Sequence, residues 1–204
     1  MKYYLVAGEA SGDLHGSNLM KHLKIADKNA VFRYFGGDLM QAEGGTLVKH
    51  YREMAFMGLL NVIRNIGTIK KNMRICQNDL LSYKPDVLIL IDYAGFNLRM
   101  AQFARQHNIR VFYYIAPKVW AWKTYRVKKI KAFVDHLFTI LPFETAFFAK
   151  HGIDTNYVGN PLLDAVATFR AKPEKNNFRI ENKLDERPVV ALLSGSRAQE
   201  IKNT

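Results

Sequence analysis

Short apolar runs alternate with longer amphipathic segments along most of the chain. Each short run stops at a glycine or a polar residue, which is typical of strands buried in a parallel sheet. The longer segments repeat apolar residues at the three- to four-residue spacing of a helix. We predict strands at residues 3–7, 31–35, 86–91, 109–115, 136–141 and 155–158. We predict helices at residues 14–25, 54–66, 69–81, 97–106, 123–132 and 142–150.

This alternation predicts an α/β fold, with a Rossmann-like parallel sheet that carries helices on both faces. We assign residues 1–168 to this domain. Residues 169–187 are charged, polar and bounded by proline, as linkers are, and we read them as a linker. The apolar run at 189–193 and the turn after it predict the first strand of a second domain at residues 188–204. We therefore expect a chain that is truncated where that domain begins.

The charge of the chain favours anionic partners. Thirty Lys and Arg residues against 18 Asp and Glu give a formal net charge of +12, with basic clusters at residues 64–74 and 118–131. Nucleic acid, an anionic membrane surface and phosphorylated substrates all remain open on charge alone. The single Cys76 excludes an internal disulfide and suits a reducing cytoplasm, where it would be a buried apolar residue. No signal peptide or apolar run of about 20 residues is present.

Polar residues that directly follow strands are the first site candidates, because open α/β sheets bind ligands at the carboxyl ends of their strands. Gly8–Asp13 follows the first strand, and its glycines would let the backbone approach a ligand. Glu9 and Ser11 suit sugar hydroxyls. Asp13 or Ser11 could instead cap the following helix.

Asp92 follows the most apolar strand of the chain. A carboxylate at the mouth of a buried strand is partly desolvated, which raises its pKa and suits a general base. The alternative is a cap on the next helix, and position alone does not separate the two roles.

Two tryptophans, Trp120 and Trp122, lie among lysines in the loop after the next strand. They could form a platform for a sugar ring, pack against the basic helix, or stack nucleic-acid bases. The turn at Ser194–Arg197 has the small residues and the arginine of an anion-binding helix start.

Six segments occur in an order that resembles the lipid-A-disaccharide synthase family, which are inverting glycosyltransferases of the two-domain GT-B architecture. They are Gly8–Asp13, Ile91–Asn97, Pro117–Trp122, Pro142–Glu144, Val158–Pro161 and Ser194–Arg197. The resemblance implies that the parent enzyme joins UDP-2,3-diacylglucosamine to 2,3-diacylglucosamine 1-phosphate, and that it releases UDP. It implies no metal and no cofactor.

The resemblance also implies roles for individual residues. Asp92 would deprotonate the acceptor 6-hydroxyl. Substrate would be bound by Glu9, Ser11, Asn97 and Trp120. Arg197 would bind the donor diphosphate in the second domain. The chain alone would then be nearly inactive.

The same resemblance, together with the basic charge, predicts a cytoplasmic protein that is peripheral on the inner face of the inner membrane. The apolar stretch at 54–66 would be a core helix or a membrane-dipping segment. Nucleic acid is not expected as a partner, and a homodimer is left open. The alternatives are another GT-B protein, such as a UDP-N-acetylglucosamine 2-epimerase-like enzyme, or a stand-alone module that binds phospholipids or phosphosugars.

Overall fold

The computed structural model describes residues 1–54, 66–170 and 178–193. The chain divides into two compact units, Met1–Asp164 and Ala165–Thr204. The helix predicted at residues 54–66 and the predicted anion site at Arg197 lie outside the described residues, apart from the two ends of that helix.

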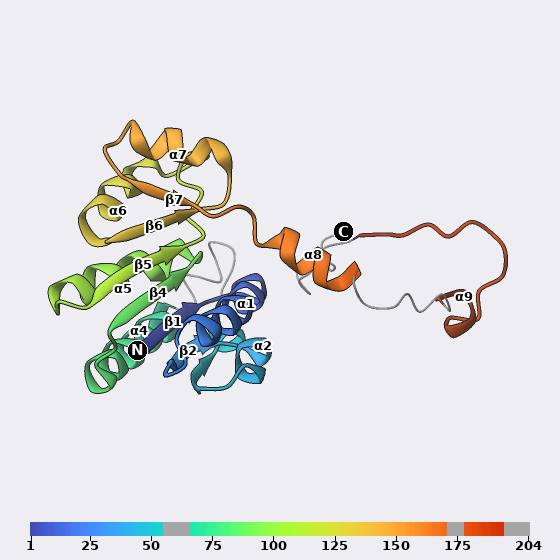
Figure 1. Ribbon diagram of the computed structural model, residues 1–204, viewed down its shortest axis with the longest axis horizontal. Coiled ribbons are helices and arrows are strands. Elements are labelled where there is room, and N and C mark those ends of the chain that lie inside the picture. Colours follow the sequence, from blue (N-terminus) through green and yellow to red (C-terminus); the bar gives the residue numbers. More distant parts are fainter. Residues whose placement is uncertain (55–65, 171–177, 194–204) are drawn as a thin grey trace. The chain divides into compact units, whose positions relative to one another are not determined.

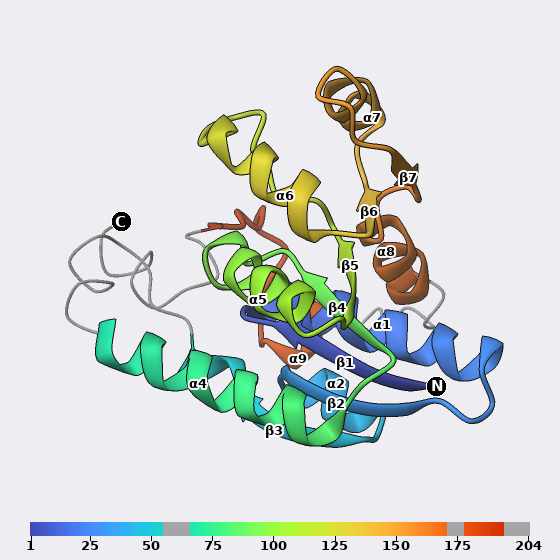
Figure 2. The ribbon, with the colours of Figure 1, turned by 90° about the vertical axis from the view of Figure 1, so that its left-hand side faces the viewer.

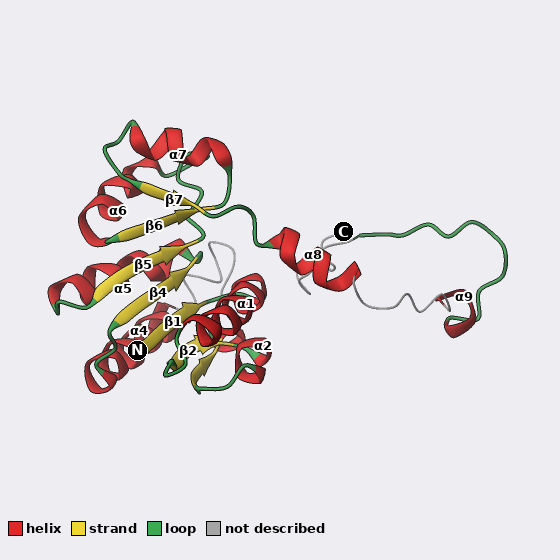
Figure 3. Ribbon diagram, in the orientation of Figure 1, coloured by secondary structure: helices red, strands yellow, loops and turns green. Residues whose placement is uncertain are grey.

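The first unit is built on a seven-stranded sheet in the order β3-β2-β1-β4-β5-β6-β7, in which every pair of neighbours is parallel (Figures 1 and 3). The strands are β1 (Lys2–Ala7), β2 (Val31–Gly36), β3 (Thr46–His50), β4 (Val87–Ile91), β5 (Arg110–Tyr114), β6 (His136–Thr139) and β7 (Thr155–Tyr157). The predicted α/β fold with a parallel sheet is therefore confirmed.

Helices connect most of these strands. They are α1 (Ala10–Ala26), α2 (Asp38–Ala42), α4 (Ile66–Tyr83), α5 (Ala94–Gln106), α6 (Val127–Phe133) and α7 (Pro142–Ala149), with short 3-10 helices η1 (Tyr51–Glu53) and η2 (Thr124–Arg126). Two further helices, α8 (Leu162–Arg170) and α9 (Phe178–Glu181), follow β7. Described side chains of the second unit, from residue 178 onward, are almost all exposed.

Residues of each central strand alternate between two hydrophobic cores, one on each face of the sheet. In β1, Tyr4 and Val6 belong to the core beneath α4, α5, α6 and α7, whereas Leu5 and Ala7 belong to the core beneath α1 and α2. The two layers of helices are seen edge-on in Figure 2. Because a parallel strand buried on both faces needs apolar side chains in both directions, this arrangement explains the unbroken apolar runs.

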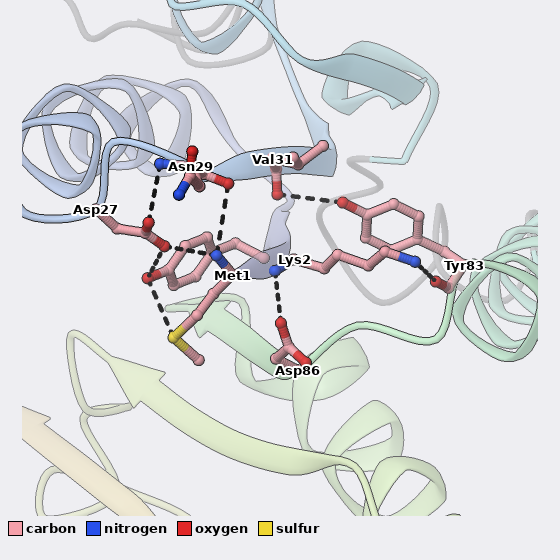
Figure 4. Close-up of polar contacts among 8 residues, drawn as sticks. Met1, Lys2, Asp27, Asn29, Val31, Tyr83 and Asp86 are labelled. Atoms are coloured by element: carbon pink, nitrogen blue, oxygen red, sulfur yellow. Dashed lines mark hydrogen bonds and ion pairs between the residues drawn. The ribbon is translucent and has the colours of Figure 1, made fainter.

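The amino-terminal ends of the strands are fixed by polar contacts (Figure 4). The Met1 ammonium donates to Asp27 Oδ2 at 2.7 Å, and the Lys2 N–H donates to Asp86 Oδ2 at 2.7 Å. These contacts anchor β1 at the end of the sheet opposite to its carboxyl ends, so that the loops at the carboxyl ends start from a rigid base.

The secondary structure differs from the prediction in several places. The edge strand β3 and the short helix α2 were not predicted, since both are too short to show a clear apolar period. Residues 189–193, predicted as the first strand of a second domain, have no regular structure here, and Leu193 is 93 % exposed. A strand forms only against a hydrogen-bonded neighbour, and none lies beside this segment in the described part of the chain.

Candidate functional site

A cavity of about 410 Å³ opens at the carboxyl ends of β1, β4 and β5. The strand order reverses between β1 and β4, because β2 and β3 lie on one side of β1 while β4 to β7 lie on the other. Open α/β sheets bind ligands in the crevice at such a reversal, because the loops on either side diverge there. The cavity therefore lies where the topology places a binding site.

The cavity wall combines charged, aromatic and small residues. Its lining residues in the described part of the chain are the acidic Glu9 and Asp92, the basic Lys118 and Arg126, the aromatic Tyr93 and Trp122, and Ala94, Gly95, Pro117 and Val119. Both charge signs and two aromatic faces in one cavity suit a polar ligand that carries hydroxyl groups and an anionic group.

Strained backbone surrounds this cavity. Asp92 (φ 44°) and Tyr93 (φ 46°) are consecutive left-handed residues after β4, and Ile115 (φ 63°) follows β5. A β-branched residue such as Ile115 rarely adopts this conformation, and an aromatic residue such as Tyr93 seldom does, although aspartate tolerates it better. Strain of this kind persists where surrounding contacts fix the backbone, and it concentrates at functional sites.

Two side chains hold the backbone of Asp92. Its carbonyl oxygen accepts the Tyr113 hydroxyl at 2.6 Å and the Asn97 side-chain amide at 2.8 Å. The same amide lies 3.2 Å from the carbonyl of Ile91 and 3.3 Å from that of Val6. Asn97 thus joins the carboxyl ends of β1 and β4. Since it is fully buried, it lies beneath the cavity and not on its wall.

The surroundings of Asp92 oppose its ionisation. Its side chain reaches solvent at the cavity mouth, but the walls displace enough water to raise the pKa of the carboxyl above its ordinary value. The nearby Lys118 ammonium and the Tyr93 backbone N–H act in the opposite direction and do not cancel the effect. A carboxylate with a raised pKa holds a transferred proton better, which is the property that a general base requires.

The turn after β1 divides its polar residues between the cavity and the fold. Glu9 occupies the N-cap position of α1 without a side-chain capping hydrogen bond, and it lines the cavity. Ser11 is exposed in the first turn of α1 and does not line the cavity. Asp13 is buried and caps a different helix from the one predicted. Its carboxylate accepts the backbone N–H groups of Gly37, Leu39 and Met40 at 2.7 to 3.0 Å, at the start of α2.

Gly8 is needed for packing rather than for approach to a ligand. A Cβ atom at this position would lie 2.3 Å from Cδ1 of Tyr93. The Tyr93 ring also stacks on Phe96, with ring centroids 5.8 Å apart, and its hydroxyl donates to the carbonyl of Met54 at 2.9 Å. The glycine therefore makes room for an aromatic ring that lines the cavity.

The two tryptophans of the loop after β5 have different surroundings. Trp120 packs edge-on against Phe143 and donates its indole N–H to Glu144 at 3.2 Å. Trp122 is 62 % exposed, lines the cavity and carries the Lys123 ammonium 3.9 Å from its ring centroid. Of the two tryptophans considered as a sugar platform, Trp122 lines the cavity and Trp120 packs beside it.

A family model for lipid-A-disaccharide synthetase matches residues 3–204 of the chain. The chain belongs to this family. Curated lipid-A-disaccharide synthases from Geobacter metallireducens, Coxiella burnetii (strain Dugway 5J108-111) and Chromohalobacter salexigens are 42 %, 37 % and 39 % identical to it, over 97 %, 97 % and 99 % of its length. The chain spans about half the length of these relatives, 51 % to 52 %.

Solved structures of UDP-N-acetylglucosamine 2-epimerases share the fold of this family member. The enzyme from Neisseria meningitidis, crystallised with UDP-GlcNAc, superposes with a TM-score of 0.64 at 12 % identity over 89 % of this chain and 52 % of its own. The enzyme from Rickettsia bellii gives 0.63 at 15 % identity over 91 % and 52 %. At such identities the likeness concerns the fold alone.

Among the described charged and aromatic lining residues of this lipid-A-disaccharide synthetase family member, Tyr93 and Arg126 were not singled out from the sequence. Trp122 and Lys118 were noted only as members of the loop of tryptophans and lysines after β5. The common signal of these four residues is that each lies in a loop after β4 or β5. Among the described residues, no group of three or more His, Cys, Asp or Glu side chains could hold a metal ion. No described helix is long and apolar enough to cross a membrane.

A second cavity, of about 550 Å³, lies against the face of the sheet that α1 covers. Apolar side chains such as Leu23, Ile89 and Phe112 form most of its wall, and Arg110 carries the one charged side chain among its described lining residues. Without a cluster of convergent polar groups it offers no acid–base chemistry, so Asp92 and its neighbours remain the candidate site.

Proposed function

We propose that this chain forms the acceptor-binding half of a lipid-A-disaccharide synthase. In this proposal the parent enzyme condenses UDP-2,3-diacylglucosamine with 2,3-diacylglucosamine 1-phosphate, giving lipid A disaccharide 1-phosphate and UDP. The observation that carries it is the cavity at the strand-order reversal, where Asp92 is fixed through its backbone and its pKa is raised. Membership of the family supplies the substrates.

The proposed chemistry needs one proton transfer from the acceptor. The Asp92 carboxylate accepts the proton of the acceptor 6-hydroxyl while that oxygen forms a bond to C1 of the donor sugar. The bond from C1 to the UDP oxygen breaks on the opposite side, and the electron pair leaves with UDP. Such a displacement inverts C1 and requires the two reacting atoms to be held about 3 to 3.5 Å apart.

The other lining residues then act in binding. Glu9 accepts hydrogen bonds from sugar hydroxyls, and the exposed ring of Trp122 offers an apolar face to the sugar ring. Asn97 acts indirectly, since it holds the backbone of Asp92 from below. We keep Ser11 and Trp120 as proposed substrate contacts at the edge of the site, and Arg197 as the proposed diphosphate ligand.

We further propose that the protein works in the cytoplasm as a peripheral protein on an anionic membrane surface. The exposed aromatic side chains of Trp122 and Tyr125 lie within the basic segment at residues 118–131. Aromatic rings insert at the headgroup level while lysines attract anionic lipids. A membrane surface beside the cavity would bring a lipid acceptor directly to Asp92.

Calorimetry in detergent tests the acceptor assignment. The chain is titrated separately with 2,3-diacylglucosamine 1-phosphate and with UDP. We expect the lipid to bind and UDP to bind weakly or not at all. Tight binding of UDP without binding of the lipid would show that the cavity belongs to the donor side, and the proposed roles of Glu9 and Asp92 would fall with the assignment.

A further inference from the structure

Charges of opposite sign in the cavity come from different loops. The carboxylates of Glu9 and Asp92 follow the adjacent strands β1 and β4. The cations of Lys118 and Arg126 both follow β5, one directly after the strand and one in η2. A ligand with an anionic group at one end and hydroxyls at the other therefore fits the charges of the cavity in one orientation only. In the reverse orientation its anionic group would lie against the carboxylates of Glu9 and Asp92.

Both cations lack an ion pair among the described residues, although the Lys118 ammonium is close enough to Asp92 to act on the pKa of its carboxyl. Neither Lys118 nor Arg126 forms an ion pair with a carboxylate there, although Arg33 and Arg105 each do, at 2.6 and 2.7 Å. Arg126 is also half-buried. A partly desolvated guanidinium without a protein carboxylate has donors to spare for a ligand, and its planar fork matches two oxygens of a phosphate.

We propose that Lys118 and Arg126 form a phosphate subsite that orients the acceptor. The subsite takes a phosphate monoester on a sugar and turns the sugar hydroxyls toward Glu9 and Asp92. This inference rests on the proposed function, in which the acceptor carries a 1-phosphate and reacts through its 6-hydroxyl. In this inference, Lys118 and Arg126 select the productive orientation of the acceptor over the reversed orientation.

Paired calorimetric titrations of the 204-residue chain in detergent test the subsite. The probes are 2,3-diacylglucosamine 1-phosphate, the same glycolipid without phosphate, and glucosamine 1-phosphate without acyl chains. We expect Arg126→Gln and Lys118→Gln each to weaken binding of the phosphorylated lipid by about 10- to 100-fold, as for the loss of a charged hydrogen bond. Binding of the lipid without phosphate should stay within about twofold.

Arg126→Lys keeps the charge and loses the fork, so we expect an intermediate loss, which also guards against a simple folding defect. Arg99→Gln and Lys150→Gln are matched controls, because both residues are exposed and neither lines the cavity. These two variants should bind all three probes as the unmodified chain does.

The outcomes separate this inference from the proposed function. If glucosamine 1-phosphate binds in an Arg126- and Lys118-dependent way but acyl chains add nothing, the phosphate subsite stands and the lipid-acceptor assignment falls. If the lipid binds equally well with and without its phosphate, or if both variants bind the phosphorylated lipid normally, the subsite is refuted and the acceptor assignment stands. If no probe binds, both fall.

Discussion

Asp92 is positioned through its own carbonyl oxygen. Two buried donors, Tyr113 and Asn97, bind that oxygen and hold the residue in a left-handed conformation that it would otherwise seldom adopt. Its carboxylate is consequently directed by the backbone while its surroundings withdraw water from it. Fixing the backbone leaves the carboxylate oxygens available to a ligand, which a base held by strong ion pairs would not allow.

Replacement of Asp92 tests its role as the base. In an enzyme extended to the length of its relatives, we expect Asp92→Asn to lower kcat by roughly 10²- to 10⁴-fold, the usual contribution of a general base. Because the base must be ionised and its pKa is raised, the rate of the unmodified enzyme should fall with decreasing pH at a higher pH than an ordinary aspartate would cause. Steady-state kinetics across the acid range measure both effects.

Asp154→Asn is the matched control for this experiment, since Asp154 is exposed and does not line the cavity. Its kcat and pH profile should match those of the unmodified enzyme. Near-normal turnover by Asp92→Asn would remove Asp92 as the base and leave it as a structural residue of the loop after β4.

The Tyr113 hydroxyl provides a test of positioning. Tyr113 is fully buried, and Tyr113→Phe removes the 2.6 Å hydrogen bond to Asp92 while the ring keeps its packing. We expect a loss of stability of about 1 kcal/mol, measured by urea unfolding. We also expect kcat of the extended enzyme to fall by about tenfold with little change in KM, because a misplaced base affects the transition state more than binding. An unchanged kcat would limit Tyr113 to a role in stability.

At the scale of elements, Asp13 joins α1 to the turn between β2 and α2. Three buried or half-buried backbone N–H groups donate to its carboxylate. We expect Asp13→Ala to destabilise the protein by about 2 kcal/mol or more, because those donors lose a charged acceptor and water cannot readily replace it. Asp13→Asn keeps one acceptor oxygen and should lose less.

Urea unfolding of the chain measures this effect, with the exposed Asp154→Ala as the control. A stability of Asp13→Ala equal to that of the control would mean that α2 contributes little to the cooperative unit. The sequence predicted that Asp13 or Ser11 caps the helix that follows it, whereas Asp13 binds the start of α2. The helix that Asp13 caps is set by the packing of α2 against α1, and α2 begins 25 residues after Asp13, at Asp38.

Prediction from sequence succeeded for elements whose signal is local. The buried strands β1, β4 and β5 were predicted because both of their faces need apolar residues, which produces unbroken apolar runs. The edge strand β3 was missed, since its partly exposed residues mix Thr, Lys and His with apolar residues. The run at 189–193 has the pattern of a buried strand, but pattern alone does not supply a neighbouring strand.

The same limit applies to the candidate site. Asp92 and Glu9 were predicted because each directly follows a strand, and the topology brings those two strand ends together. The sequence did not show which of Trp120 and Trp122 lines the cavity, because Trp120 is held by the buried carboxylate of Glu144. That carboxylate also accepts the backbone N–H groups of Ile140 and Leu141, just before α7. Long-range contacts of this kind decide which side chain is left to line a cavity.

At the scale of the whole molecule, the exposed rings of Trp122 and Tyr125 lie within the basic segment at residues 118–131, which includes η2 and most of α6. Tyr125 is 63 % exposed, and Lys123, Lys128 and Lys129 are exposed within five residues of it. A formal net charge of +12 attracts the protein to anionic surfaces in general, whereas a tyrosine among lysines adds a specific point of contact. The two contributions differ in their dependence on salt, because screening weakens only the electrostatic one.

Vesicle flotation separates them. We expect the chain to float with vesicles that contain phosphatidylglycerol and to stay in solution with pure phosphatidylcholine, and we expect the binding to weaken as salt is raised. Lys128→Gln combined with Lys129→Gln should reduce binding by roughly tenfold or more, at about 1 kcal/mol for each lysine near the surface. Tyr125→Ala should reduce binding at low and high salt alike, whereas Tyr157→Ala, a similarly exposed tyrosine on β7, should not. If all three variants bind as the unmodified chain does, the membrane is contacted elsewhere, and the lipid acceptor would have to reach Asp92 by another route.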